Sequence, residues 1–246
     1  MSRTVFGVNP VLEALRAHPE QVERVVFAEG AKPHALGEIR SRAQKAHVRV
    51  DQVPRARLDA QSEGGVHQGV LAEVADFAYA ELEDLLEPRE GPPPLLVLLD
   101  GIQDPHNLGA LIRSAHAFGA RGVVIPADRA VGVTAVAAKA SAGAVEHCQV
   151  ARVVNLARAV ESLKEAGIWT AAAVVDGDTL PWQLDLAGPS ALVLGAEGKG
   201  VRPLVARTCD FRVRIPMAGA LGSLNASAAG AALLYEAHRQ RTQSNR

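Results

Sequence analysis

Three segments of the sequence combine glycine residues with amide, carboxylate or guanidinium side chains, and each follows a predicted strand. Glycine lets the backbone approach a ligand closely, and the polar groups can orient or stabilise a substrate through charge-assisted hydrogen bonds. In open α/β sheets, ligands bind at the carboxyl ends of the strands. These segments are therefore candidates for a binding site. They are residues 99–120 (LDGIQDPHNLGALIRSAHAFGA), 192–203 (LVLGAEGKGVRP) and 215–239 (IPMAGALGSLNASAAGAALLYEAHR).

The first segment contains a turn signal, Asp104-Pro105, followed by Asn107 and Arg113. Asn107 is predicted to cap the helix on which Arg113 lies. The two residues are six apart, so both reach the same end of the sheet only if the loop folds back. On spacing alone, an ordinary strand–helix turn with a surface arginine explains this segment equally well.

The second segment places Glu197 between Gly195 and Gly198, where its carboxylate would be exposed to a ligand. It is not a nucleotide-binding P-loop, because Gly200 stands where a serine or threonine is required to meet Mg²⁺. The glycine spacing also differs from the dinucleotide-binding fingerprint. The missing motifs count against an NTPase or a dehydrogenase, and a simple flexible turn remains the alternative.

The third segment is irregular from residue 216 to 223 and then predicts a helix, with Asn225 and Ser227 as candidate N-cap residues. The helix begins with a run of small side chains, residues 226–232. Ser227 and Gly230 weaken a helix, and surface helices usually carry charge. The run therefore indicates a place where another part of the backbone lies very close.

Strand-like and helix-like patterns alternate along the chain, which is typical of an α/β fold with a mostly parallel sheet. The run LLVLLD at residues 95–100 is continuously apolar, as expected of a strand that is buried on both faces. Strands are predicted over residues 22–28, 47–50, 69–74, 95–100, 122–125, 169–175, 191–195 and 211–215, and helices over 10–17 with Asn9 as the cap, 32–46, 108–118, 134–142, 155–166 with Asn155 as the cap, and 225–239.

The chain of 246 residues divides into two predicted domains, residues 1–75 and 95–246. Residues 76–94 (DFAYAELEDLLEPREGPPP) are acidic, then rich in proline, which predicts an extended linker. A surface helix and loop within one domain is the alternative. Residues 76–90 carry one basic and six acidic side chains. The rest of the chain is therefore mildly basic, although the net charge of the whole chain is −1. Charge therefore permits an RNA ligand without indicating one.

Composition excludes several other classes of protein. Cys148 and Cys209 lie in no CxxC motif or Cys/His cluster, so neither a metal site nor a disulfide framework is expected. Aromatic residues make up 4% of the chain, which counts against base recognition mainly by stacking. No apolar run has the length of a signal peptide core or a membrane span. A soluble cytoplasmic protein is expected.

At the three segments the chain resembles the SpoU family of RNA 2′-O-ribose methyltransferases, a branch of the SPOUT superfamily, over about residues 95–241. The resemblance implies a knotted (trefoil), mostly parallel-sheet catalytic domain, a homodimer with the active site near its interface, and S-adenosyl-L-methionine as cofactor, without a metal. The matching residues are Asn107, Gly109 and Arg113; Gly195, Glu197, Gly198 and Gly200; and Ile215, Pro216, Met217, Ser223, Leu224, Asn225 and Ser227.

The resemblance also implies residue roles. It implies that Arg113 activates the ribose 2′-hydroxyl. Because a guanidinium stays protonated at neutral pH, arginine is a poor base, and we expect Arg113 instead to stabilise the developing 2′-alkoxide and to anchor the adjacent phosphate. Asn107 would orient Arg113 or the ribose, Glu197 would hold Arg113 or a substrate hydroxyl, and Asn225 and Ser227 would complete the polar wall. The expected cofactor-binding residues are Leu194, Gly195, Ile215, Met217, Ser223 and Leu224.

His106, next to Asn107, is a second candidate for the base, because the unperturbed pKa of histidine is near 6.5. The alternative is a loop residue that helps to grip RNA.

Two N-terminal stretches, residues 6–15 (FGVNPVLEAL) and 64–74 (GGVHQGVLAEV), resemble the small RNA-binding domain, similar to a ribosomal-protein fold, of family members that modify large-subunit rRNA. This second resemblance implies a guanosine of 23S rRNA as the substrate. A tRNA substrate and a non-catalytic RNA-binding relative remain the alternatives.

Overall fold

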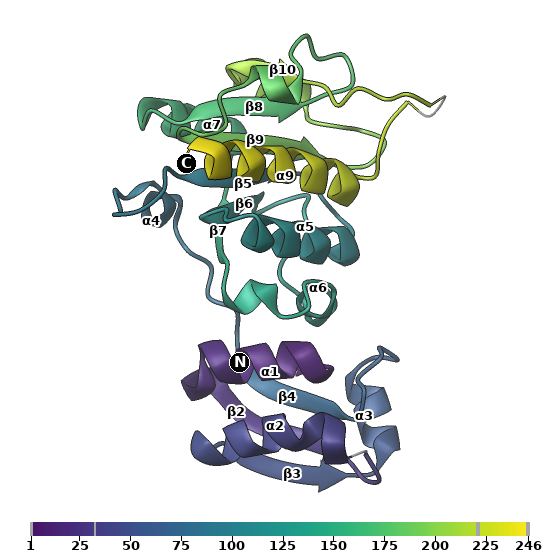
Figure 1. Ribbon diagram of the computed structural model, residues 1–246. Helices are drawn as coiled ribbons and strands as arrows, with labels where there is room; N and C mark the ends of the chain where they lie inside the picture. Colours follow the sequence, from purple (N-terminus) through teal and green to yellow (C-terminus); the bar gives the residue numbers. More distant parts are fainter. Residues whose placement is uncertain (1, 32, 220–221, 245–246) are drawn as a thin grey trace. The chain divides into compact units, whose positions relative to one another are not determined.

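The computed structural model describes residues 2–31, 33–219 and 222–244. They form two compact units, which Figure 1 draws in one view. The first unit comprises Met1–Ala78 and Val133–His147, and the second comprises Tyr79–Gly132 and Cys148–Arg246. Each unit is described below by itself.

The second unit is built on a six-stranded sheet in which all neighbouring strands are parallel, in the order β10-β8-β9-β5-β6-β7. Its central strand β5 is buried along its whole length, as its continuous apolar sequence predicted. The mostly parallel α/β fold is thereby confirmed. The strands are β5 (Leu95–Asp100), β6 (Gly122–Pro126), β7 (Gln149–Val153), β8 (Trp169–Ala173), β9 (Ser190–Gly195) and β10 (Phe211–Val213).

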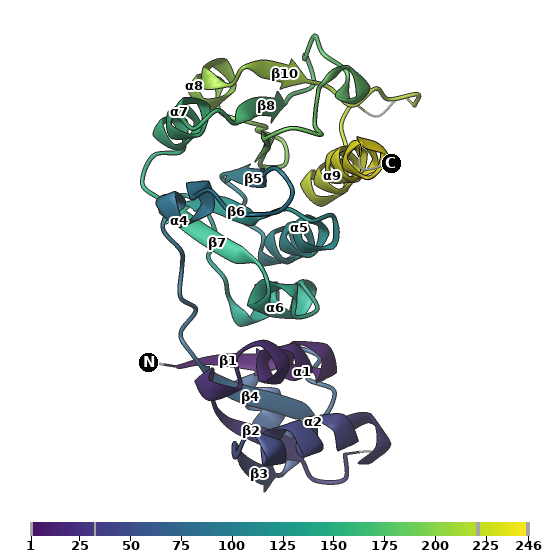
Figure 2. The ribbon, with the colours of Figure 1, turned by 60° about the vertical axis from the view of Figure 1, so that its left-hand side comes forward.

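Helices cover both faces of this sheet. Figure 2 shows α5 and α9 side by side on one face and α7 with α8 on the other. The helices are α4 (Leu82–Leu86), α5 (Pro105–Ala117), α7 (Leu156–Glu165), α8 (Pro203–Thr208) and α9 (Ala226–Ser244).

The small-residue run of α9 lies at a close helix contact. A Cβ atom on Gly230 would stand 2.3 Å from a Leu111 methyl group of α5 and 2.8 Å from a Leu194 methyl group of β9. At Gly230 the close neighbours are leucine side chains, not the second stretch of backbone that was expected. The trefoil knot that the family resemblance implies stays a prediction.

The first unit contains a four-stranded sheet in the order β1-β4-β2-β3, in which only β2 and β3 are parallel among the described strands. Helices α1 and α2 cover one face over a core that includes Val25, Phe27 and Val70. The short helix α3 packs through Leu58 against the other face. The elements are β1 (Ser2–Phe6), α1 (Val8–Ala17), β2 (Val22–Ala28), α2 (Pro33–Lys45), β3 (Arg49–Val53), α3 (Arg55–Gln61), β4 (Val70–Ala75) and α6 (Ala135–Ala140).

Some predicted element boundaries are wrong. Asn107 does not cap α5; Asp104 does, and its carboxylate accepts a hydrogen bond of 2.9 Å from the His106 amide. The reason is that Pro105 occupies the first helical position, so the cap must precede it. Likewise Asn9 does not cap α1, which begins at Val8 and not at Pro10; the residue before it is Gly7, whose φ of 96° favours glycine.

Other elements have no counterpart in the predictions, namely β1, α3, β7 and α8. The segment expected to be a linker, residues 76–94, contains α4, in which Leu82 and Leu85 are buried. This helix lies in the second unit, beside β7. In the described part of the chain, no helix has the length and apolar character needed to cross a membrane.

Candidate functional site

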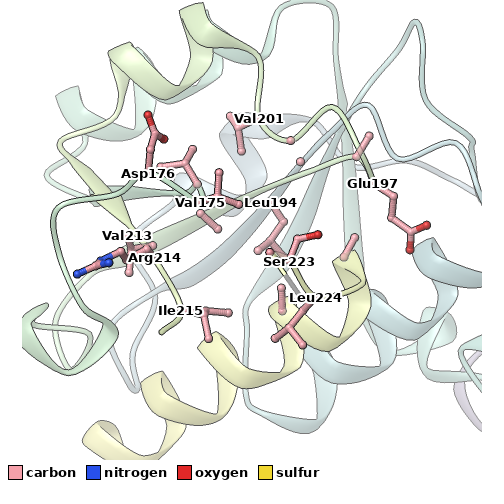
Figure 3. Close-up of a pocket in the computed structure, with 18 of the residues that line it drawn as sticks. Val175, Asp176, Leu194, Glu197, Val201, Val213, Arg214, Ile215, Ser223 and Leu224 are labelled. Atoms are coloured by element: carbon pink, nitrogen blue, oxygen red, sulfur yellow. The ribbon is translucent and has the colours of Figure 1, made fainter. Parts of the chain in front are cut away.

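A cavity of about 630 Å³ opens at the carboxyl ends of β8, β9 and β10 in the second unit. This volume is in the range of sites for small organic ligands and cofactors. Figure 3 shows the side chains around the cavity, with Leu194, Ser223 and Leu224 close together and Glu197 on the loop at one side. The expected cofactor-binding residues all line it: Leu194, Gly195, Ile215, Met217, Ser223 and Leu224.

Part of the apolar lining is open to solvent. Met217 is 39% exposed and Leu224 is 40% exposed, although both are large hydrophobic side chains. A ligand with a flat apolar surface, such as an adenine ring, would cover them and gain free energy of about 25 cal/mol per Å² of apolar area removed from water. The cavity therefore combines apolar walls with the backbone polar groups of the irregular segments 195–201, 215–217 and 222–224.

The loop after β9 is folded tightly on itself. A Cβ atom on Gly195 would lie 1.9 Å from the backbone carbon of Gly200, so no other residue fits there without moving the loop. The Gly200 amide donates a 2.8 Å hydrogen bond to the Ala196 carbonyl, and both Gly198 and Gly200 have positive φ angles, 74° and 64°. The glycines predicted from the sequence are thus required by the backbone path.

Asp100 anchors this loop from the neighbouring strand β5. Its side chain is fully buried and accepts two hydrogen bonds of 2.7 Å from Arg202, one from the backbone amide and one from the guanidinium Nε. The Asp100 carbonyl also accepts a 3.1 Å hydrogen bond from the Ala196 amide. In the sequence, Asp100 could be recognised only as the last residue of a predicted strand, and its pairing with Arg202 was not predicted.

Three segments that are far apart in the sequence meet in a polar cluster beside the cavity. Asn107 Nδ2 donates to Glu197 Oε1 at 3.1 Å, and Asn225 Nδ2 donates to Asn107 Oδ1 at 3.0 Å and also to Glu197 Oε1. The Asn225 Oδ1 atom accepts hydrogen bonds from the Ser227 amide at 2.9 Å and the Ser227 hydroxyl at 2.5 Å. Four of the five expected catalytic residues are therefore brought together.

Asn225 has two functions in this arrangement. Through Oδ1 it caps α9, since that atom also accepts from the Ala228 amide at 3.3 Å. Through Nδ2 it holds the Glu197 carboxylate. The cap fixes the rotamer that the second function needs, so the start of α9 positions the cluster.

Arg113 is not part of the cluster within one chain. It lies on α5, exposed, six residues after Asn107, which places it about 240° further around the helix. Asn107 and Glu197 were each expected to contact either Arg113 or the substrate. Neither is hydrogen-bonded to Arg113, and the two side chains are hydrogen-bonded to each other. His106 is likewise exposed, at the first turn of α5.

Among the described residues, no group of three or more His, Cys, Asp or Glu side chains is arranged to hold a metal ion. Cys148 and Cys209 are both buried, and burial raises the pKa of each thiol to about 12. Both thiols therefore stay protonated at neutral pH and provide no thiolate nucleophile.

Two family models match the chain. The model of the SpoU rRNA methylase family matches residues 94–235. A model described as RNA 2′-O ribose methyltransferase substrate binding matches residues 4–80.

Named relatives match nearly the whole chain. A 23S rRNA (guanosine-2′-O-)-methyltransferase of Pseudomonas aeruginosa is 44% identical, with 97% of this chain and 96% of the relative covered. A putative TrmH family tRNA/rRNA methyltransferase of Bacillus subtilis is also 44% identical, over 96% and 95%. Among solved structures, the SpoU methyltransferase AviRb from Streptomyces viridochromogenes, in complex with AdoMet, has a TM-score of 0.81 at 27% identity, covering 98% of this chain and 91% of its own.

Proposed function

Because the chain belongs to the SpoU rRNA methylase family, we propose that it transfers the methyl group of S-adenosylmethionine to the ribose 2′-hydroxyl of a guanosine in 23S rRNA. The observation that carries this proposal is the placement of a cavity next to a cluster made from all three family motifs. The 42% and 44% identical relatives from Pseudomonas species that are named for this reaction support the choice of substrate.

The residues of the cavity fit the proposed cofactor. Leu194, Ile215 and Leu224 offer apolar contact to the adenine ring, and the irregular loops offer backbone amides and carbonyls to its edge. When bound, the cofactor supplies a sulfonium methyl group that is open to attack by an oxygen nucleophile. Glu197 both lines this cavity and belongs to the polar cluster with Asn107, so a cofactor in the cavity would lie next to the cluster.

The polar cluster would hold the ribose for in-line attack. In the reaction the ribose 2′-oxygen would bond to the methyl carbon while the sulfur–methyl bond breaks, which would leave the cofactor as a neutral thioether, and the hydroxyl proton would pass to solvent. Positioning of this kind contributes much of the rate of a two-substrate reaction. Glu197 and Asn107 would bind ribose hydroxyls, and Arg113 would stabilise the negative charge on the 2′-oxygen.

The location of Arg113 supports the homodimer that the family resemblance implies, which stays a proposal. Arg113 is exposed, and its position on α5 lies about 240° around the helix from Asn107. A dimer with the active site near its interface would let Arg113 of one copy serve the cluster of the other. Closed two-fold dimers are the most common soluble oligomers.

RNA binding is assigned to the first unit, whose sequence is matched by the substrate-binding family model over residues 4–80. The domain division proposed from the sequence, 1–75 for RNA binding and 95–246 for catalysis, is retained with this assignment. A role in ribosome biogenesis in the cytoplasm is the corresponding cellular proposal.

The identity of the RNA substrate can be tested by offering the protein rRNA and tRNA in separate reactions. The second candidate, tRNA, is favoured by the name of the Bacillus subtilis relative, which mentions both. Unmodified 23S rRNA and unmodified tRNA are each incubated with the protein and S-adenosylmethionine, digested to nucleosides and analysed by mass spectrometry. The proposal expects 2′-O-methylguanosine from rRNA only, and its appearance from tRNA only would replace the substrate.

A further inference from the structure

The face of the first unit's sheet on which α3 packs also carries a row of charged side chains. In the strand register, Glu73 of β4 lies opposite Arg24 of β2, and Arg24 lies opposite Arg49 of the edge strand β3. Figure 1 shows β2, β3 and α3 of this unit. Arg24 and Arg49 line a depression of about 360 Å³ between the sheet and α3. It is lined by Arg24, Val26, Arg49, Asp51, Gln52, Val53, Arg57 and Gln61.

The positive and negative side chains around the depression do not balance. Arg24 is fixed at its floor by Glu73, at 2.5 and 2.6 Å, and by Asp51 at 3.4 Å. Asp51 also accepts a 3.0 Å hydrogen bond from Arg49, so two guanidinium groups neutralise the single acidic lining residue. Arg49 is 70% exposed, and Arg57 is exposed on α3. With Glu73 included, three arginines face two carboxylates, so one positive charge is in excess, and Arg57 on α3 has no carboxylate among the lining residues.

The opposite face of the same unit gives a contrast. On α1 and α2, Arg16 pairs with Glu13 at 2.6 Å and with Glu38 at 2.8 Å, and Arg42 pairs with Glu38 at 3.0 Å. The arginines of the helical face are thus matched by carboxylates, whereas those at the rim of the depression outnumber them.

We propose that this depression binds the phosphodiester backbone of the substrate RNA, with Arg49 and Arg57 contacting phosphates and Gln61 contacting a ribose hydroxyl. The inference rests on the proposed function, which makes RNA the ligand of this unit. Guanidinium groups bind phosphate through two parallel hydrogen bonds, and most hydrogen bonds between proteins and nucleic acids go to phosphate and sugar. None of the lining residues is aromatic, which favours the backbone over stacked bases.

The test measures binding of the full-length protein to unmodified, transcribed 23S rRNA over a range of salt concentrations. Each phosphate contact contributes about 0.7 to the slope of log K against log salt on single-stranded RNA. Arg49→Ala/Arg57→Ala is therefore expected to lower that slope by about 1.4, and to weaken binding about 25-fold at about 0.1 M salt. Arg49→Lys/Arg57→Lys, which keeps both charges, should retain most of the slope.

Arg16→Ala/Arg42→Ala is the matched control, since it removes the same charge from the helical face. It should bind RNA like the parent, and all variants should have the circular dichroism spectrum and the S-adenosylmethionine affinity of the parent. Parental RNA affinity and salt slope in the depression variant would overturn the inference. An equal loss in the control would also overturn it, because the effect would then be one of net charge.

The outcomes separate this inference from the proposed function. If the parent binds 23S rRNA through the depression and methylates none, the proposed function fails and the binding surface stands. If the parent methylates 23S rRNA and the depression variant binds it unchanged, the binding surface fails and the proposed function stands.

Discussion

The buried carboxylate of Asp100 holds both the backbone amide and the guanidinium of Arg202, each at 2.7 Å, although 102 residues separate them in the chain. This pair ties the end of β5 to the end of the loop that lines the cavity.

Replacing Asp100 by alanine should loosen that loop. Lost hydrogen bonds to a buried carboxylate cost about 1.5–3 kcal/mol each before relaxation, and half of the Arg202 surface is in solvent, so the expected loss of stability is about 2 kcal/mol. The dissociation constant for S-adenosylmethionine, measured by calorimetry, should rise at least about tenfold, which corresponds to about 1.4 kcal/mol. Arg207→Ala is the control, because it removes a charge from α8, the helix that follows Arg202, and it should bind the cofactor normally. Normal cofactor affinity in Asp100→Ala would contradict the anchoring role.

Asn225→Asp separates the two functions of Asn225. The substituted side chain keeps an oxygen to cap α9, so the melting temperature should change little. It loses the amide donor and puts a second carboxylate beside Glu197, and kcat for methyl transfer should fall by about 100-fold or more. Ser227→Ala, which removes only the hydroxyl contact to Asn225, should have a much smaller effect on kcat. An Asn225→Asp enzyme with near-normal kcat would exclude the cluster from catalysis.

Arg113→Ala should abolish methyl transfer while leaving folding and cofactor binding intact. The side chain is exposed, so the change in stability should stay within about 0.5 kcal/mol. If Arg113 acts across a dimer, an equal mixture of inactive Arg113→Ala and inactive Glu197→Ala chains that exchange subunits should recover about a quarter of the parent activity, since half of the dimers carry one complete site. No recovery after subunit exchange would place Arg113 in its own chain's site.

Gly195→Ala should destroy cofactor binding, because its Cβ would overlap the backbone of Gly200. The relevant measurement is S-adenosylmethionine affinity at equal circular dichroism signal. Gly219→Ala is the control, since a Cβ there meets nothing within 4 Å. Tight cofactor binding by Gly195→Ala would mean that the loop adopts another path.

The sequence predicted best the elements whose signal is local. The strand β5 was found with its exact bounds because its apolar run is continuous, and Asn155 was found as the cap of α7, where it accepts from two amides at 3.0 and 3.2 Å. The cap of α5 was misplaced although Asp104-Pro105 carries the signal for it. The strand β7 (QVARV) and the helix α8 were missed because they are short and mix polar with apolar residues.

The contacts within the candidate site could not be predicted from local sequence patterns. Asn107 and Asn225 lie 118 residues apart, and no spacing rule predicts that their side chains touch. The family resemblance identified the residues of the cluster, and only the structure showed that Asn107 binds Glu197 while Arg113 lies on another side of α5. For the pairing of Asp100 with Arg202, the sequence shows only a carboxylate at the end of a predicted buried strand, and nothing in it identifies the partner.

The most direct test of the central claim follows the methyl group itself. Unmodified 23S rRNA is incubated with the protein and S-adenosylmethionine that carries a deuterated methyl group, and the RNA is digested to nucleosides for mass spectrometry. The account predicts guanosine with the labelled methyl group on the ribose, and none when the protein is Arg113→Ala. Label on a base, or no label although the protein binds the cofactor and the RNA, would contradict it.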